Sequence, residues 1–213
     1  MTEKIKCGFE YGRDNYLVNI CRGKKVLHIG ACDAPYTLQK FKNNLLLHAK
    51  LSKVSREILG IDIDKDAIEF LSQKGYDNIV YYNMDNLGDL EFKPEVIVFG
   101  ETIEHLTNPG RALENIKKIT NDECELLIST PNAFYIMNFF NSIRKKEEAH
   151  EDHKVLFSYQ TLKQLLESKS FEIAETTYTF LDRKDGGCKK QVFKKIMSKF
   201  PVLAETLIFR CKG

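Results

Sequence analysis

The sequence lacks the features that mark several specialised classes of protein. It contains no tryptophan, only 5 prolines and 12 glycines among 213 residues, and no internal repeat, which excludes collagen-like and low-complexity chains. The longest apolar runs have about six residues, whereas a membrane-spanning helix needs about 20. Residues 1–8 include no apolar stretch of signal-peptide length, so we expect a cytoplasmic protein without a membrane partner.

Charge and cysteine content exclude two further classes. The 32 basic and 30 acidic residues leave a net charge of +2, and this balance does not indicate nucleic acid as a partner. The six cysteines are scattered without a Cys-x-x-Cys pair, which argues against a zinc ribbon and against a disulfide framework. With 43% hydrophobic residues, the chain has enough apolar side chains for the core of one domain.

Strand-like apolar runs alternate with helical patterns along most of the chain. Candidate strands lie at residues 25–30, 58–63, 79–82, 95–99, 125–129, 171–180 and 203–211, and candidate helices at residues 66–74, 109–120 and 158–168. Apolar strands followed by helices are typical of a parallel sheet covered on both faces. The pattern predicts a single-domain α/β protein with a seven-stranded, mostly parallel sheet. Residues 1–23 would form an N-terminal helical segment and residues 24–213 the domain.

Small residues follow the first candidate strand, at the kind of strand end where parallel sheets bind ligands. Gly30, Ala31, Cys32 and Ala34 would let the backbone approach a ligand closely. Only Gly30 remains of the glycines of a dinucleotide-binding loop, and Pro35 stands where its helix should already have begun. A phosphate-binding loop is also absent, so this loop favours a cofactor without phosphates.

Carboxylates follow the second and third candidate strands. Asp62 can accept hydrogen bonds from both hydroxyls of a ribose, or it can simply cap the next helix. Asp64 precedes a helical pattern directly, and we expect it to be the N-cap. Asp85 could receive the exocyclic amine of an adenine, or it could be an ordinary turn residue.

Five ordered motifs now resemble class I S-adenosylmethionine-dependent methyltransferases. They are HIGACDA (residues 28–34), GID (60–62), NMD (83–85), FGETIEHL (99–106) and STPN (129–132). The sequence is similar to a subgroup with E-x-x-E-H-L and T-P-N motifs, and to small methyltransferases of bacterial polysaccharide and capsule biosynthesis. The resemblance implies a Rossmann-like fold with an antiparallel last strand. It also implies S-adenosylmethionine as cofactor and S-adenosylhomocysteine as its product.

The same resemblance implies the residues that contact the cofactor. The loop after the first strand would face the methionine part, Asp62 the ribose and Asp85 the adenine, while Glu101 would lie near the methionine end. His28 stands where the family carries an acid. The implied set is His28, Gly30, Ala31, Cys32, Asp33, Ala34, Asp62, Ile63, Met84, Asp85, Asn86 and Glu101.

Methyl transfer to a hydroxyl requires a group that removes the acceptor's proton, and histidine suits this task near neutral pH. The candidates are His105, His150 and His153, each of which could also be a solvated surface residue. We favour His153, with His105 and Glu101 as further catalytic residues. Alternatively, Glu101, Glu104, His105 and His153 would hold a divalent metal. We favour the metal-free base, because the local E-x-x-E-H segment supplies at most three ligands.

These observations predict an S-adenosylmethionine-dependent O-methyltransferase acting on a small, anionic, sugar- or phosphate-containing acceptor. By resemblance, a polysaccharide or capsule precursor or a phosphoramidate fits this description. Between positions 183 and 212 there are nine basic residues and two acidic ones. These basic residues either attract an anionic acceptor or form a solvated helix face. The alternatives are a metal-dependent O-methyltransferase of RNA ends or quinone precursors and a non-catalytic cofactor-binding protein. We expect a monomer or homodimer.

Overall fold

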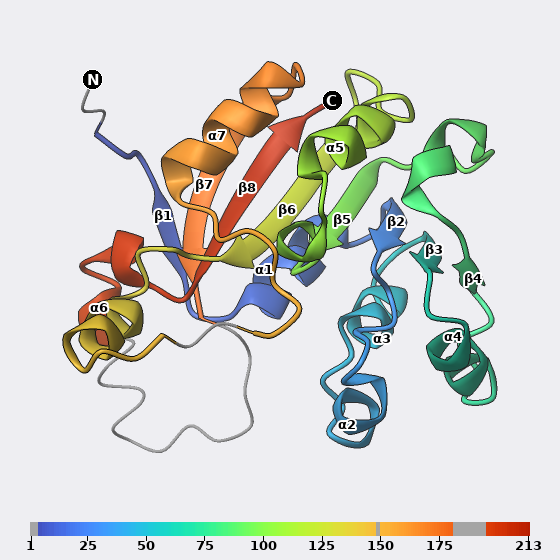
Figure 1. The fold of residues 1–213 in the computed structure, drawn as a ribbon. Helices are drawn as coiled ribbons and strands as arrows, with labels where there is room; N and C mark the ends of the chain where they lie inside the picture. Colours follow the sequence, from blue (N-terminus) through green and yellow to red (C-terminus); the bar gives the residue numbers. More distant parts are fainter. Residues whose placement is uncertain (1–3, 148–149, 181–194) are drawn as a thin grey trace.

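An eight-stranded β-sheet forms the centre of the protein, and helices cover both of its faces (Figure 1). The computed structural model describes residues 4–147, 150–180 and 195–213. The strands are β1 (Gly8–Glu10), β2 (Lys25–Ile29), β3 (Glu57–Asp62), β4 (Ile79–Tyr81), β5 (Val96–Gly100), β6 (Glu125–Pro131), β7 (Glu172–Thr179) and β8 (Thr206–Lys212). The α-helices are α1 (Arg13–Cys21), α2 (Thr37–Lys42), α3 (Leu47–Ser52), α4 (Lys65–Ser72), α5 (Pro109–Lys117), α6 (Ile136–Ile143) and α7 (Tyr159–Ser168), and the short 3₁₀ helices are η1 (Met84–Asp89), η2 (Ile103–His105) and η3 (Pro201–Leu203).

The strand order is β1-β7-β8-β6-β5-β2-β3-β4. Strand β8 is antiparallel to both of its neighbours, β6 and β7, whereas every other neighbouring pair is parallel. The predicted Rossmann-like α/β fold with an antiparallel last strand is therefore confirmed. The predicted count of seven strands falls one short of the described sheet, because residues 8–10 pair with residues 177–179 of β7.

The additional strand lies in the N-terminal segment that was expected to be helical. That segment contains helix α1 and, before it, strand β1. A three-residue strand is too short to produce the apolar run or the alternation by which strands are detected in a sequence. Of the basic run between positions 183 and 212, residues 183–194 lie outside the described residues.

Side chains alternate between the two faces of the sheet and divide the core into two layers. Leu27, Ile97 and Phe99 pack with α5, α7 and η1 on one face. Val26 and Val98 pack with α1 and α3 on the other face. This alternation follows from the strand period of two, and it buries both faces of the parallel strands.

Strand β2 marks the point where the order of the sheet reverses. The chain passes from β2 outward to β3 and β4, and then returns to β5 on the other side of β2. The loops after β2 and β5 consequently diverge to opposite faces, which opens a crevice at the carboxyl ends of these strands. The motifs singled out in the sequence follow β2, β3, β4, β5 and β6, so the fold brings them to one edge.

The described residues also limit what the helices and cysteines can do. No helix among them is both long and apolar enough to cross a membrane.

The described cysteines are free thiols: Cys7, Cys21, Cys32, Cys124 and Cys211. Burial raises the pKa of Cys21 and of Cys211 to about 12, so both thiols stay protonated and act as core side chains.

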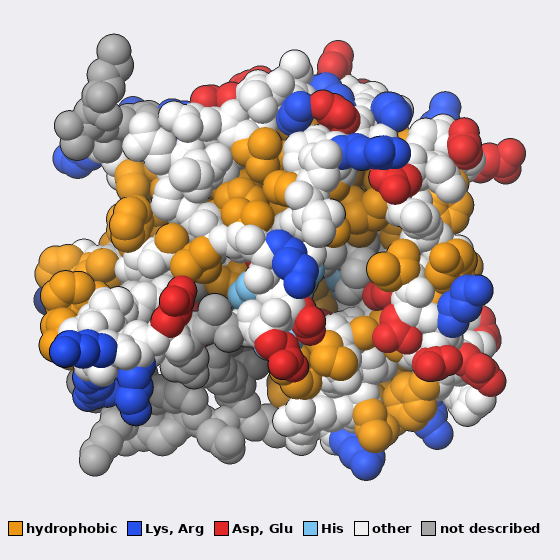
Figure 2. All heavy atoms as spheres, in the orientation of Figure 1, with side chains coloured by type: hydrophobic (Ala, Val, Ile, Leu, Met, Phe, Trp, Pro, Cys, Tyr) orange, Lys and Arg blue, Asp and Glu red, His pale blue; other side chains and the backbone are white. Residues whose placement is uncertain are grey.

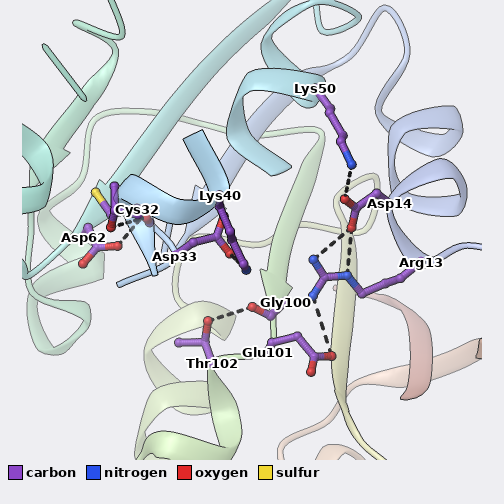
Figure 3. Close-up of polar contacts among 11 residues, drawn as sticks. Arg13, Asp14, Cys32, Asp33, Lys40, Lys50, Asp62, Gly100, Glu101 and Thr102 are labelled. Carbon is purple, nitrogen blue, oxygen red and sulfur yellow. Dashed lines mark hydrogen bonds and ion pairs between the residues drawn. The ribbon is translucent and has the colours of Figure 1, made fainter. Parts of the chain in front are cut away.

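Helix α1 is fixed to the body of the protein by buried charges (Figure 3). The Arg13 guanidinium lies 2.9 Å from the carboxylate of Asp14, and the ammonium of Lys50 on α3 reaches the other carboxylate oxygen at 2.5 Å. Arg13 and Asp14 are only 5% and 4% exposed. Burial opposes ionisation of Asp14, but the charges of Arg13 and Lys50 outweigh it and lower the pKa of Asp14.

We predict that Asp14→Asn lowers the free energy of unfolding by about 3 kcal/mol at neutral pH, because it removes the nearer of the two carboxylates that neutralise the buried Arg13. The pKa of Asp14 lies below 3.8 in the folded protein, so its stabilisation is present above that value and is lost as the pH falls further. The difference between the two proteins should therefore shrink on acidification. Urea denaturation across a pH series measures this.

The matched control is Asp122→Asn, because Asp122 is an exposed turn residue. It should change stability by less than about 0.5 kcal/mol. Equal losses for the two variants, or a loss at Asp14 that does not vary with pH, would contradict a stabilising role of the buried ion pairs.

Candidate active site

A pocket of about 370 Å³ opens at the reversal point of the sheet. Its walls come from the ends of β2 and β3, from η1, and from the segment that leads from β5 through η2 into α5. The lining residues are Ile29, Gly30, Ile61, Asp62, Ile63, Tyr82, Asn83, Met84, Asp85, Thr102, Leu106, Thr107, Asn108, Arg111 and Ala112. Carboxylates and apolar side chains thus share one cavity, which is the usual composition of a small-molecule site.

Gly30 is the residue of the first loop that must be a glycine. Its φ is +73°, and a Cβ built there would lie 2.6 Å from Oγ1 of Thr102. The Thr102 hydroxyl is itself held in place, because it donates a hydrogen bond to the carbonyl oxygen of Gly100 at 2.9 Å (Figure 3). Gly30 therefore lets the β2 loop pass closely over the β5 loop at the pocket wall.

Asp62 lies where the β2 and β3 loops meet. One carboxylate oxygen accepts a hydrogen bond from the amide of Cys32 at 2.9 Å, and the other accepts one from the amide of Ile63 at 2.7 Å. These bonds fix the carboxylate at the pocket wall and leave lone pairs for a ligand. Asp64 accepts from the amide of Ala67 and caps α4, so the N-cap prediction is confirmed. A ribose at Asp62 stays a prediction.

The expected adenine side of the pocket includes Met84 and Asp85. The carboxylate of Asp85 lies 3.1 Å from Nε of Arg111 on α5, and both side chains are more than half exposed. This exposed pair closes one side of the pocket and can open at little cost. Asn86 is not part of the pocket lining among the described residues, although its carbonyl accepts a hydrogen bond from the Tyr82 hydroxyl.

Most of the first loop lies outside this pocket. His28 is buried and pairs with His48, with 3.2 Å between the two Nδ1 atoms, and burial lowers its pKa well below the ordinary value. Ala31 and Cys32 are core residues, and Ala34 is exposed. Asp33 pairs with Lys40. Within the described part of the chain, Ile29 and Gly30 are the members of residues 28–34 that line the pocket, so cofactor contacts by His28, Ala31, Cys32, Asp33 and Ala34 stay predictions.

Glu101 follows β5 in a left-handed backbone conformation, with a φ of +48°. Its amide donates to the carbonyl of Ser129, and its carboxylate lies 3.7 Å from the guanidinium of Arg13 (Figure 3). Burial raises the pKa of Glu101, although the Arg13 charge opposes the rise. Arg13 was not expected at the site, because nothing in the pattern around residue 13 indicates a contact with a residue so far along the chain.

Glu104 is a buried residue that supports the site. One carboxylate oxygen accepts from the Thr130 hydroxyl at 3.2 Å, while Oε1 has no hydrogen-bond partner in the described residues. Burial and then the charge of Glu101 raise the pKa of Glu104 well above its ordinary value, which favours the protonated form. Its backbone carbonyl accepts from the amides of Lys154 and Val155, and so holds the segment after His153 in place.

Three histidines gather beside the pocket. A ring nitrogen from each of His105, His150 and His153 lies within 4.8 Å of the other two. The rings of His105 and His153 are 4.8 Å apart, and the hydroxyl of Tyr36 lies 2.7 Å from Nε2 of His150. Burial, followed by the neighbouring histidines, lowers the pKa of His153. Burial also lowers the pKa of His105.

The structure therefore groups His105 and His153 with His150, and this described group does not include Glu101 or Glu104. His150 was a candidate from the sequence but was not favoured. The signal that could have found it is the His-x-x-His spacing of His150 and His153, which a turn can bring to one side of a loop. Their backbones are hydrogen-bonded across that turn at 3.0 Å.

The chain matches a known protein family. A family described as "Methyltransferase domain" matches residues 21–176, which is more than half of the chain. No curated protein matches the sequence.

Solved structures match over nearly the whole chain at low sequence identity. A SAM-dependent methyltransferase from Archaeoglobus fulgidus is 19% identical, covers 94% of this chain and 91% of its own, and has a TM-score of 0.58. Magnesium protoporphyrin IX methyltransferase from Synechocystis, solved with S-adenosylhomocysteine, is 12% identical with coverages of 93% and 81% and a TM-score of 0.62. N-methyltransferase NodS from Bradyrhizobium japonicum, also in complex with S-adenosylhomocysteine, is 14% identical with coverages of 94% and 85% and a TM-score of 0.58. At these identities the likeness concerns the fold.

We predict that Asp62→Ala weakens binding of S-adenosylhomocysteine at least tenfold. Losing charge-assisted hydrogen bonds to the ribose hydroxyls should cost about 1.5–3 kcal/mol. Titration calorimetry on both proteins measures the change.

Asp64→Ala is the matched control, because it removes a neighbouring carboxylate that caps α4. It should lower the stability of the protein by about 1 kcal/mol and leave cofactor affinity unchanged. Unchanged affinity in Asp62→Ala would mean that the ribose is held elsewhere.

Proposed function

The chain belongs to the methyltransferase-domain family, and we propose that it is an O-methyltransferase whose acceptor is a small anionic molecule containing a sugar or a phosphate. It is an enzyme that uses S-adenosylmethionine as methyl donor. The reading as a non-catalytic binding protein is therefore set aside. A polysaccharide or capsule precursor, or a phosphoramidate, is the class of acceptor that we favour.

The observation that carries this proposal is the position of the histidine group beside the pocket. Helix η2 connects Thr102 to Leu106, which both line the pocket, and His105 lies between them in the chain. His153 is next to His105 in space. None of the three histidines is in the described lining of the cavity, but the nearness of His105 in the chain to two lining residues supports a role for the group where an acceptor would meet the bound donor.

The residues of the pocket fit the methyl donor. The cavity lies at the sheet reversal, Asp62 offers a fixed carboxylate, and Ile63, Met84 and Leu106 offer apolar surface for a purine. When bound, S-adenosylmethionine supplies a methyl group on a positively charged sulfur, which is a good leaving group. Positioning then provides much of the rate, and the protein must also remove the proton of the acceptor hydroxyl.

We assign that proton to a ring nitrogen of His153, with His105 beside it. Because burial and neighbouring histidines lower the pKa of His153, its ring is neutral and able to accept a proton at neutral pH. The guanidinium of Arg13 and the hydrogen bond from the Glu101 amide to the Ser129 carbonyl hold Glu101 in place. Its carboxylate therefore has a defined position at the end of β5. Glu104 holds the segment after His153 through its backbone carbonyl.

Positive charge near the histidine group supports an anionic acceptor. Lys154 follows His153 directly, and its charge contributes to the lowered pKa of His105. The exposed residues Arg144, Lys145 and Lys146 precede the same loop. Asp152 opposes this charge locally, and residues 144–154 as a whole contain four basic and four acidic residues, so the support comes from the position of Lys154 beside the histidines and not from the net charge of the segment.

We predict that His153→Ala lowers kcat by about 10²–10⁴ and changes cofactor affinity little, since the ring acts on the acceptor. The rate of the unmodified enzyme should rise with pH and reach a plateau, with its midpoint below the ordinary histidine value of 6.5. The sign follows because the neutral ring is the active form and its pKa is lowered. A His153→Ala variant with full kcat would show that His153 is not the base. His150→Ala is the control, because it removes a neighbouring ring and leaves His153 in place.

The acceptor class is tested with methyl-labelled S-adenosylmethionine and a panel of sugar phosphates, nucleotide sugars and phosphoramidates. Label should appear on members of this panel and not on the matched neutral sugars. Transfer to phenolic quinone precursors or to RNA ends instead would contradict the proposed acceptor.

A second candidate function follows from the three histidines, because three imidazoles within reach of one another can hold a divalent ion. The enzyme would then be a metal-dependent O-methyltransferase of RNA ends or quinone precursors, in which the ion lowers the pKa of the acceptor hydroxyl. Removal of metal by a chelator distinguishes the two. The metal-free base predicts unchanged turnover, whereas turnover that is lost on chelation and restored by metal would favour the second candidate.

A further inference from the structure

Helix α6 presents an apolar face to solvent. The exposed fractions are 60% for Phe134, 37% for Met137, 61% for Phe139, 46% for Phe140 and 64% for Ile143. No residue of α6 is buried. Apolar side chains that are scattered singly over a surface need no explanation, but five within ten consecutive residues form a continuous patch.

Helix α6 turns Ile136 toward the core, whereas Phe139, Phe140 and Ile143 face solvent. A surface helix normally turns its apolar stripe toward the core and its polar stripe toward water. In α6 the polar side chain of Asn138 faces the protein, where its amide donates to the backbone carbonyls of Asn132 and Ala133 at 3.4 and 3.3 Å. Phe139, Phe140 and Ile143 therefore contribute little to folding, and their retention needs another reason.

A second apolar segment adjoins α6. Ile196 and Phe200 are about half exposed, at 50% and 56%. Asn132, just before α6, donates to the carbonyl of Val202 at 2.7 Å, which ties the two segments together. Figure 2 shows hydrophobic side chains gathered at the lower left, over the position of α6 in Figure 1, with Lys and Arg side chains along the border.

The border of the patch is basic. Arg144, Lys145 and Lys146 follow α6 directly and are exposed, and the second segment contains the exposed Lys195 and Lys199. In residues 134–147 and 195–200, Glu147 is the one acidic residue. Aromatic and aliphatic side chains beside lysine and arginine are the composition of helices that lie in the surface of an anionic bilayer.

We propose that this apolar–basic face, formed by residues 134–146 and 195–200, docks on the surface of a lipid bilayer that carries anionic headgroups. The Phe and Ile side chains enter the boundary between headgroups and acyl chains, and the basic border contacts the lipid charges. A nucleic acid would interact with the basic side chains but not with the aliphatic ones. A nucleic-acid partner therefore accounts for only part of the composition of this face. Docking of this kind is reversible and needs no membrane-spanning helix.

The position of the face gives docking a consequence for the active site. Strands β5 and β6 are parallel, so the segment after β6 that leads into α6 leaves the same edge of the sheet as Glu101. Docking through α6 would therefore bring the carboxyl edge of the sheet, with its pocket, toward the bilayer. This inference does not depend on the identity of the acceptor.

The test is co-sedimentation of the full chain with two kinds of vesicle, one of phosphatidylcholine alone and one containing phosphatidylglycerol as well. Phe139→Ser combined with Ile143→Ser removes the apolar side chains, and Lys145→Glu combined with Lys146→Glu reverses the basic border. Leu38→Ser is the matched control, because Leu38 is 49% exposed on α2, away from this face. Circular dichroism and S-adenosylhomocysteine affinity confirm that each variant is folded.

We expect the unmodified chain and Leu38→Ser to sediment with anionic vesicles and not with neutral ones, and added salt to weaken binding. Each double variant should bind about tenfold more weakly. No sedimentation with anionic vesicles, or equal sedimentation of all variants, would overturn the proposal. It would also be overturned if the chain dimerised without vesicles and the serine variant abolished that dimer, since the face would then bind a second copy.

Discussion

The reversal of strand order around β2 is the constraint on which the remainder of the site depends. Because β2 and β5 are neighbouring parallel strands, the loops that follow them leave the same edge of the sheet next to each other before they turn to opposite faces. Gly30 permits that approach, and Thr102 occupies the space that a side chain at position 30 would need. This topology brings the strand ends together at one edge. The pocket, the carboxylate of Asp62 and the histidine group all belong to segments that follow these strand ends.

Buried charge connects the N-terminal helix to the same edge. Arg13 lies between Asp14 and Glu101, and Lys50 completes the neutralisation of Asp14. Such a network contributes less to stability than its Coulomb energy suggests, because Arg13 and Asp14 have lost their water. What it provides is a defined position for Glu101, whose backbone is held in a left-handed conformation at the end of β5. Glu104, buried nearby with a raised pKa, holds the histidine-bearing segment through its main chain.

Local patterns were sufficient to predict the central strands and the capping role of Asp64, because apolar runs and caps depend on neighbours in the chain. They also selected Gly30 and Asp62, since the ends of parallel strands are where ligands bind. Strand β1 was missed because three residues carry no periodicity. Arg13 and the exposed apolar side chains of α6 were missed for a different reason. Each depends on contacts between segments far apart in sequence, and no spacing within the chain encodes them.

The central claim is that the methyl donor binds at one edge of the sheet. Its ribose would lie at Asp62, and its sulfur would point toward Glu101 and the histidine group. A crystal structure of the enzyme soaked with S-adenosylhomocysteine tests this most directly. The account predicts that both ribose hydroxyls lie within hydrogen-bond distance of the Asp62 carboxylate, with the sulfur on the side of Glu101 and His153. A ribose bound away from Asp62, or a sulfur that points toward α4, would contradict it.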